Sequence, residues 1–275
     1  MLNPFRRSVR IPRQLGACLV TGTEKIRCGY GNGDCLLLAF RHGVFAVADA
    51  TERFPQASRL LLERLAAEIS ESGPPVNGQA FESLLNRIWS QQQFIHKTTL
   101  SCVVLREDED GPTAMLANNG DSSITILDAA SGTTLFRTAA DMNFAGRSRQ
   151  PNPVATLRLQ PPGATIVLAT DGLADIGEIR ETDVVQRPDG LTQWIGIRTR
   201  NGSEPPEIDD IGAIALTAGM PAMEYATIIM GGTRPGTETD FTRSAGRKPP
   251  MDRWEPISFW QRSPELMDLA GIRVR

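Results

Sequence analysis

The chain has 275 residues, of which 40% are hydrophobic and 22% are charged, so it is long enough for one large domain or two and can bury a substantial core. Its 29 basic and 32 acidic residues give a net charge of −3, which argues against a protein that grips nucleic acid or anionic lipid mainly by charge. No stretch approaches the roughly 20 apolar residues of a membrane span, and the first residues lack the apolar core of a secretory signal. We therefore expect a cytoplasmic protein with no nucleic-acid partner and no membrane partner.

The amino terminus, residues 1–17, is predicted to be a basic, flexible arm. It carries four arginines and two prolines without a regular apolar period. An ordinary solvated terminus is the simpler interpretation, and a short transit peptide is the alternative.

Two apolar runs at 35–40 and 44–48 predict a hairpin of buried strands. Two helices are expected next. In the first, apolar residues recur every fourth position from Ala57 to Ile69, and Gly73 followed by two prolines ends it. In the second, an apolar stripe runs from Phe81 to Ile95. Core packing explains both stripes without a cofactor.

Strand-like runs dominate the rest of the predicted domain: 99–105, 114–118, 123–127, 133–136, 156–159, 165–169 and 211–216. The acidic run 107–110 is expected to be a solvated hairpin tip, because it lacks the alternating ligands of a calcium loop. Two strands, two helices and then mostly strands indicate an α+β domain over residues 18–217.

The remaining residues, 218–275, read as an extension rich in proline and glycine. Its last part, 254–270, contains three large aromatic residues and a segment from Ser263 to Ala270 that can form a short helix. This part either docks on the domain or binds a protein partner, and docking is favoured because free aromatic side chains would be a liability.

Cysteine and histidine are too scarce for several common chemistries. Four cysteines with no CxxC pair do not make a disulfide scaffold, and with only two histidines a zinc site would need an assembly of distant residues. No GxSxG elbow or Walker loop is present. The glycine string from Gly29 to Gly33 fails the GxGxxG spacing at Asp34, so a flexible turn is a better interpretation than a nucleotide loop. If the protein is an enzyme, we expect its chemistry to rest on carboxylates.

Aspartates stand at the ends of the apolar strands. Asp49 follows the run 44–48, Asp171 follows 166–170, and Asp209 and Asp210 precede 211–216. Several carboxylates that converge raise one another's pKa unless a cation neutralises them, which makes a hard divalent metal their natural companion. For any single one of them, a simple turn or cap is the competing interpretation.

Six short motifs, in this order, resemble those of the metal-dependent protein serine/threonine phosphatases of the 2C type, the PPM family. They are Asn32-Gly33-Asp34, Val47-Ala48-Asp49-Ala50, Lys97-Thr98-Thr99, Asn119-Gly120-Asp121-Ser122, Leu168-Ala169-Thr170-Asp171-Gly172-Leu173 and Asp209-Asp210-Ile211-Gly212. The resemblance covers residues 18 to 217. It implies a four-layer αββα sandwich, two antiparallel sheets with helices outside, and a site for two Mg²⁺ or Mn²⁺ ions at one end.

The resemblance also assigns roles. Asp49 would bridge the two metals, the Ala50 carbonyl would help hold one, and Asp171 and Asp209 would hold the other. Asp34 would orient or deprotonate the attacking water. Weaker candidates are Asp210 and Asp121, the latter in a loop beside the site. The substrate would be a phosphoprotein, with a small phosphate monoester as the alternative.

The chain departs from the family pattern at three places. A glutamate that binds one metal is replaced by Gly33, which should weaken that site, and the arginine that grips phosphate is replaced by Gly29. A histidine that acts as acid in many members is Thr51. Substitutes suggested by position are Glu52 as a ligand and Arg27 or Arg53 for the phosphate.

The stretch 178–208 contains several prolines and glycines and no helical stripe, so one outer helical layer is expected to be reduced, with 254–270 as a candidate to cover that face. The alternative functions are a catalytically inactive, phosphatase-like binding or regulatory module, and an unrelated α+β domain.

Overall fold

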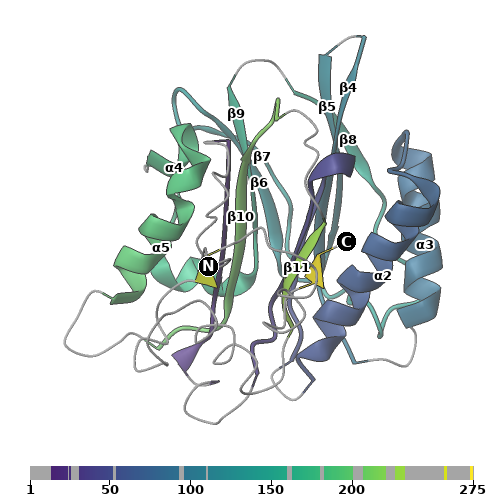
Figure 1. The fold of residues 1–275 in the computed structure, drawn as a ribbon, viewed down its shortest axis with the longest axis horizontal. Helices are drawn as coiled ribbons and strands as arrows, with labels where there is room; N and C mark the ends of the chain where they lie inside the picture. Colours follow the sequence, from purple (N-terminus) through teal and green to yellow (C-terminus); the bar gives the residue numbers. More distant parts are fainter. Residues whose placement is uncertain are drawn as a thin grey trace, which may run out of the picture.

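The structure is a computed structural model. It describes residues 14–23, 25, 31–51, 54–92, 96–109, 111–159, 163–179, 183–200, 207–220 and 227–232, together with the short strands at 257–258 and 273–274. Two sheets lie face to face, with one pair of helices outside each (Figure 1). The predicted four-layer αββα sandwich is therefore confirmed.

The first sheet has six antiparallel strands in the order β12-β1-β10-β9-β6-β7. In chain order they are β1 (Leu15–Val20), β6 (Ser123–Asp128), β7 (Thr134–Arg137), β9 (Ala164–Ala169), β10 (Ile211–Thr217) and β12 (Ile257–Ser258). One of its central pairs, β1 with β10, joins strands far apart in the chain, since Leu15 lies opposite Leu216 and Val20 opposite Ile211.

The second sheet has seven antiparallel strands in the order β13-β11-β2-β3-β4-β5-β8. They are β2 (Cys35–Ala39), β3 (Val44–Ala48), β4 (Leu100–Asp108), β5 (Gly111–Asn119), β8 (Ala155–Arg158), β11 (Ile228–Gly231) and β13 (Arg273–Val274). The predicted hairpin is β2 and β3, joined by a 3-10 turn, η2 (Phe40–His42), and by Gly43. Gly43 has φ 63°, a left-handed conformation, and a Cβ there would lie 2.7 Å from the Leu105 carbonyl oxygen, so the turn favours glycine.

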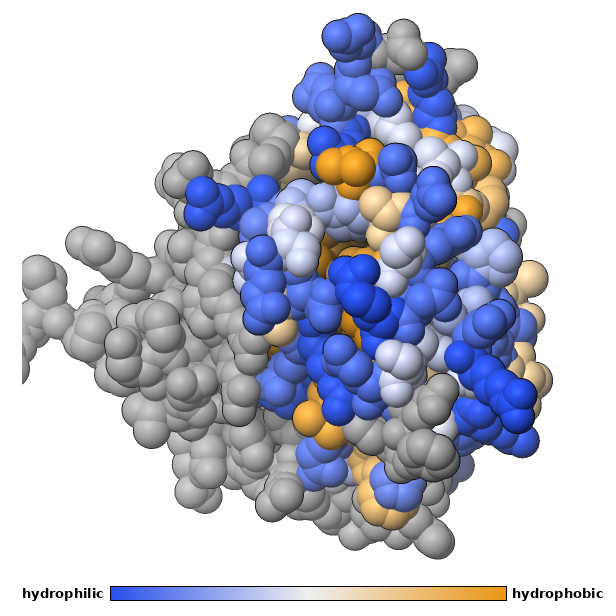
Figure 2. All heavy atoms as spheres, turned by 90° about the vertical axis from the view of Figure 1, so that its right-hand side faces the viewer, coloured by the Kyte–Doolittle hydropathy of each residue, from blue (hydrophilic) through white to orange (hydrophobic). Residues whose placement is uncertain are grey.

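Helices cover the outer face of each sheet. The second sheet packs on α2 (Gln56–Ser72) and α3 (Gly78–Gln92), and the first on α4 (Asp183–Gln186) and α5 (Leu191–Arg200), with two 3-10 turns, η3 (Asp171–Ile176) and η4 (Pro188–Gly190). The outward surface of the α2–α3 layer is mainly hydrophilic with scattered apolar side chains (Figure 2). The apolar stripes of these helices therefore face the core, as predicted.

Three apolar clusters separate the layers. Along β2, Leu36 and Leu38 point into the cluster between the sheets, whereas Leu37 points into the cluster under α2 and α3. The third cluster fills the space between the first sheet and α4–α5, and includes Leu191 and Ile195. Because strands such as β2 and β3 are buried on both faces, their sequences are continuous apolar runs without alternation.

The observed boundaries differ from the predicted ones in three places. β1 begins at Leu15, inside the predicted basic arm 1–17, and β11 lies beyond residue 217. The helical layer over the first sheet is reduced, as expected, to helices of 4 and 10 residues, but 178–208 does contain them. Of the aromatic segment 254–270, only β12 is described, and it pairs with β1; the aromatic residues and the predicted helix at 263–270 lie outside the described residues.

Within the described part of the chain, no helix is both long and apolar enough to cross a membrane.

Candidate metal centre

Strand pairing places the predicted aspartates at one end of the sandwich. In the second sheet Cys35 lies opposite Ala48, so Asp34 before β2 and Asp49 after β3 are neighbours. In the first sheet Ala169, near the end of β9, lies opposite Ser123 at the start of β6 and Ala213 near the start of β10. The residues just outside those strand ends, Asp121, Asp171, Asp209 and Asp210, therefore meet at the same end.

Three carboxylates converge closely enough to share one cation. Oxygen atoms of Asp49, Asp121 and Asp171 all lie within 4.8 Å of one another. Asp49 is half-buried, while Asp121 and Asp171 are open to solvent. Carboxylate oxygens are the ligands that Mg²⁺ prefers, and Mn²⁺ suits the same donors, so the donor set fits a hard divalent ion.

Asp34 lies beside this cluster in the interior, with 1% of its surface exposed. Its Oδ2 accepts a hydrogen bond of 2.6 Å from the Thr170 hydroxyl, whose oxygen in turn accepts one from the Gly212 backbone N–H. Its Oδ1 is buried and has no hydrogen-bond partner among the described residues. A buried carboxylate oxygen without a partner is costly, so it indicates a place for a water molecule or an ion.

The electrostatics of the site confirm that the carboxylates crowd one another. Burial raises the pKa of Asp34, with Asp49 and Asp210 adding to the effect. Burial likewise raises the pKa of Asp49, reinforced by Asp171 and Asp210, and the pKa of Asp171, reinforced by Asp121 and Asp209. Without a cation, these three groups are held in an environment that disfavours their charged forms.

Threonine and serine hydroxyls fix the backbone around Asp49. The Thr99 hydroxyl accepts a hydrogen bond from the Asp49 N–H at 2.8 Å, and the Thr98 hydroxyl donates to the Asp49 carbonyl at 2.7 Å. Thr99 also shares a hydrogen bond of 2.6 Å with Ser122, the neighbour of Asp121. The Lys97-Thr98-Thr99 motif thus links two members of the acidic cluster.

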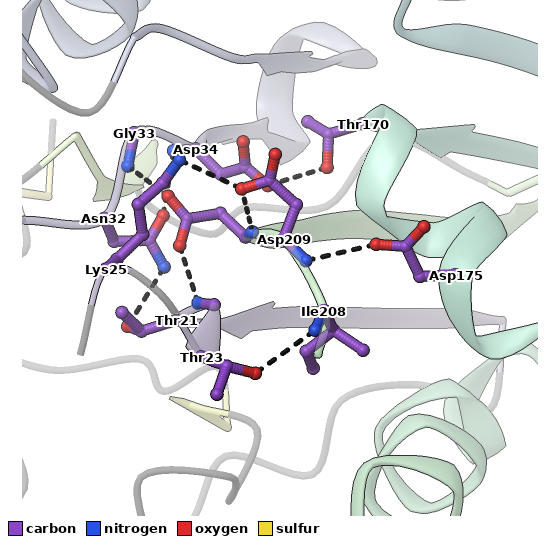
Figure 3. A network of polar contacts seen from close by, with 12 residues as sticks. Thr21, Thr23, Lys25, Asn32, Gly33, Asp34, Thr170, Asp175, Ile208 and Asp209 are labelled. Carbon is purple, nitrogen blue, oxygen red and sulfur yellow. Dashed lines mark hydrogen bonds and ion pairs between the residues drawn. The ribbon is translucent and has the colours of Figure 1, made fainter. Parts of the chain in front are cut away.

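Asp209 has a different environment from the cluster. Lys25, whose side chain is only 11% exposed, places its Nζ 3.0 Å from the Asp209 Oδ1 (Figure 3). The same oxygen accepts a hydrogen bond from the Asp210 N–H, and the Asp209 N–H donates to Asp175. The negative charge of this carboxylate is therefore already balanced by a cation of the protein.

Asp210 is likewise satisfied by the protein. Its Oδ1 accepts a hydrogen bond from the Gly22 N–H and its Oδ2 one from the Gly33 N–H, both at 2.7 Å. The space next to Gly33 is filled as well, because a Cβ on that residue would collide with the Ala50 carbonyl oxygen. The Ala50 N–H donates in turn to the Gly33 carbonyl, so the segment after β3 is tied to the segment before β2.

A groove opens beside the cluster on the outer face of the first sheet. It is a cavity of about 350 Å³ whose lining includes Asp121 and Asp171 at the site and Arg137 at the end of β7. Leu127 and Val167 give it apolar walls. Arg137 is exposed.

The sequence-based candidates therefore divide into three groups. Asp34, Asp49, Asp121 and Asp171 are brought together, with Asp121 closer to the centre than the sequence suggested. Asp209 and Asp210 are nearby but engaged. Glu52, Arg27 and Arg53 lie outside the described residues.

Sequence reasoning missed Lys25, Thr170 and Arg137. Lys25 carries no local motif, and its partner is 184 positions away in the chain. Thr170 offered a signal, since it directly precedes Asp171 at a strand end, where a hydroxyl can reach a neighbouring strand.

Comparison with known proteins agrees on the fold. No protein-family model matches the sequence, and no curated protein matches it. Among solved structures, a bacterial serine phosphatase matches with a TM-score of 0.60 at 14% identity, covering 74% of this chain and 97% of that one.

Two further structures are similar. The catalytic domain of the serine/threonine protein phosphatase PstP, in complex with 2 manganese ions, matches with a TM-score of 0.56 at 18% identity and covers 74% of this chain and 98% of that one. The PPM Ser-Thr phosphatase MsPP from Mycobacterium smegmatis, in complex with cacodylate, matches with a TM-score of 0.54 at 16% identity, covering 74% and 97%. The chain therefore has the fold of the PPM, or PP2C-type, serine/threonine phosphatases.

Proposed function

We propose that this protein is a metal-dependent phosphatase that hydrolyses phosphate monoesters, with phosphoserine or phosphothreonine in proteins as its substrates. The observation that carries the proposal is the convergence of Asp49, Asp121 and Asp171 beside the unpartnered Oδ1 of Asp34. The similarity in fold to PstP and MsPP supports the reaction class.

The residues of the chain divide the work of an in-line displacement. A bound Mg²⁺ or Mn²⁺ would neutralise the phosphate oxygens and lower the pKa of the attacking water. Asp34 accepts the proton of that water through Oδ1, and burial raises the pKa of this carboxyl above the usual aspartate value, which makes it a stronger base. The water oxygen forms a bond to phosphorus as the ester P–O bond breaks, and the leaving alkoxide takes up a proton from solvent to become the free hydroxyl.

Thr170 orients the base. Because the Gly212 N–H donates to the Thr170 oxygen, the threonine hydroxyl hydrogen is free to point at Asp34 Oδ2. That hydrogen bond holds the carboxylate through Oδ2 and leaves Oδ1 without a partner among the described residues. No covalent phosphoenzyme is needed, which agrees with the three described cysteines, Cys18, Cys35 and Cys102, being buried.

The groove beside the cluster would hold the substrate. Asp121 and Asp171 line both the cluster and the groove, so a phosphate at the cluster leads directly into it. We assign Arg137 to an anionic group of the substrate, because its guanidinium lines the groove and is exposed.

A second function is favoured by one observation. The Ala50 carbonyl fills the space in which a side chain at position 33 would begin, so a familiar ligand of the family is replaced by backbone. That substitution suits a phosphatase-like module that binds a phosphorylated partner without turning it over.

Hydrolysis of a phosphothreonine peptide and of p-nitrophenyl phosphate separates the two functions. We expect phosphate release with Mn²⁺ that stops on chelation, and loss of that activity in Asp49→Asn. Metal-independent binding of the peptide without phosphate release would instead identify a binding module.

A further inference from the structure

The geometry points to a centre that holds a single divalent ion at Asp49, Asp121 and Asp171, with the ammonium group of Lys25 supplying the second positive charge. This inference rests on the proposed function, and it departs from the two-ion site that the family resemblance implies. It makes Asp121, and not Asp209, the third carboxylate ligand.

Three carboxylates are available to bind a cation. Asp49, Asp121 and Asp171 each offer an oxygen within 4.8 Å of the other two. Asp34 Oδ1 adds an unpartnered acceptor beside them that is fully buried. Burial and the neighbouring carboxylates raise the pKa values of Asp34, Asp49 and Asp171, so a cation at this place would favour their charged forms.

The carboxylate of Asp209 is already neutralised by the protein. Lys25 Nζ lies 3.0 Å from Asp209 Oδ1, and the lysine side chain is almost buried. A lysine ammonium held at this distance provides a fixed unit charge next to the cluster, which a metal ion at Asp209 would have to displace. Asp209 still acts electrostatically on Asp49 and Asp171, so the ion pair is part of the same charged region.

Asp210 and residue 33 are the remaining positions at which a second ion could be held. Asp210 uses both oxygens on the backbone N–H groups of Gly22 and Gly33. Gly33 has no side chain to offer, and the Ala50 carbonyl oxygen points at the place where one would begin. Among the described residues, neither Asp210 nor position 33 therefore offers a free carboxylate oxygen to a second ion.

Mn²⁺ binding to the full chain tests the inference directly. Calorimetric titration should give a single equivalent of Mn²⁺ per chain. Asp121→Asn should weaken the dissociation constant at least about tenfold, because it removes one of few charged ligands. Asp209→Asn should weaken it much less than Asp121→Asn does, because the Asp209 side chain is half exposed and bound to Lys25.

Two further variants address Lys25 itself. Lys25→Gln should tighten Mn²⁺ binding at least about threefold, because a positive charge beside the carboxylates is removed. The double variant with Lys25→Gln and Asp209→Asn keeps the net charge and replaces the ion pair by two neutral amide side chains, so its Mn²⁺ affinity should stay within about threefold of the natural chain. The double variant also serves if Lys25→Gln alone does not fold.

The outcomes are distinct. Two equivalents of Mn²⁺, or a tenfold loss of affinity in Asp209→Asn with little loss in Asp121→Asn, would overturn the single-ion centre while leaving a metal-dependent phosphatase. Unchanged affinity in Lys25→Gln would overturn the role of the lysine. No Mn²⁺ binding to the natural chain would contradict both this inference and the proposed function.

Discussion

The acidic end of the sandwich contains two sets of carboxylates with opposite surroundings. Asp209 and Asp210 are neutralised by the protein itself, the first by Lys25 and the second by two backbone N–H groups. Asp34, Asp49 and Asp171 are held close together, and their pKa values are raised. One set therefore holds the ends of the strands together, while the other is left for a cation and a substrate.

This division shows what proximity alone does not. All of these aspartates lie at strand ends, at the same end of the sandwich. Their positions in the sequence do not distinguish them. Their partners do: a carboxylate that already accepts hydrogen bonds from fixed donors gains little from a metal ion, whereas an unpartnered one gains much. Four changes would break or sharpen this comparison.

Asp34→Asn should have the largest effect on catalysis. An amide keeps the hydrogen bond with Thr170 but is a poor proton acceptor, so kcat should fall about 10²–10⁴-fold. Steady-state hydrolysis of a phosphothreonine peptide measures it, with Mn²⁺ affinity as the control for an intact site. A kcat within tenfold of the natural value would show that Asp34 is not the base.

Asp210→Ala should be the most destabilising change. It leaves the buried N–H groups of Gly22 and Gly33 without acceptors, at a cost of about 3 kcal/mol in the free energy of unfolding. Urea denaturation measures it. Asp128→Ala is a matched control, because that exposed aspartate also accepts two backbone hydrogen bonds and should cost much less. Equal costs for the two variants would refute the structural role of Asp210.

Asp49→Asn should stabilise the metal-free protein while abolishing metal-dependent activity. The folded state raises the pKa of Asp49, so its stabilising contribution is present below about pH 4, the usual aspartate range, and is lost as the pH rises through the folded value. At neutral pH the variant should therefore be more stable than the natural chain.

The difference in stability between Asp49→Asn and the natural chain should shrink toward acidic pH. It should also shrink when Mn²⁺ is added to the natural chain. Thermal unfolding in a chelator at several pH values measures it. A natural chain that is the more stable one at neutral pH without metal would contradict the crowding of these carboxylates.

Arg137→Ala should have the smallest effect. If this side chain binds an anionic group of the substrate, KM should rise about three- to tenfold with little change in kcat. Arg149→Ala is the control, since Arg149 is exposed and lies outside the groove. The same change in KM for both variants would show that the effect comes from the overall charge of the protein and not from binding by Arg137.

Much of the fold was predictable because its signals are local. The hairpin of β2 and β3, the stripes of α2 and α3 and the runs of β4 to β6 and β9 to β10 are contiguous in the sequence. β1 was missed because it joins the basic segment at the amino terminus, and its partner β10 is about 200 residues away. The short helix α5 was missed because Gly196 interrupts a ten-residue segment that its packing on the first sheet nevertheless stabilises.

The candidate site was predictable in part for the same reason. Acids at the ends of apolar strands indicated Asp49 and Asp171, and the family resemblance added Asp34; antiparallel pairing brings them together. The pairing of Lys25 with Asp209 depends on the alignment of β1 with β10, and the position of Asp121 depends on the turn at Gly120, which has φ 91°. The pairing of Lys25 with Asp209 carries no signal that one sequence can show, whereas the motif Asn119-Gly120-Asp121-Ser122 indicated Asp121 only as a residue beside the site.

The most direct test of the phosphatase proposal is the rate of phosphate release from a phosphothreonine peptide as a function of Mn²⁺ concentration. We expect no release in chelator and a rate that rises with Mn²⁺ and saturates over the concentration range in which the ion binds. A rate that stays at the chelator level while Mn²⁺ saturates its site would contradict the proposal.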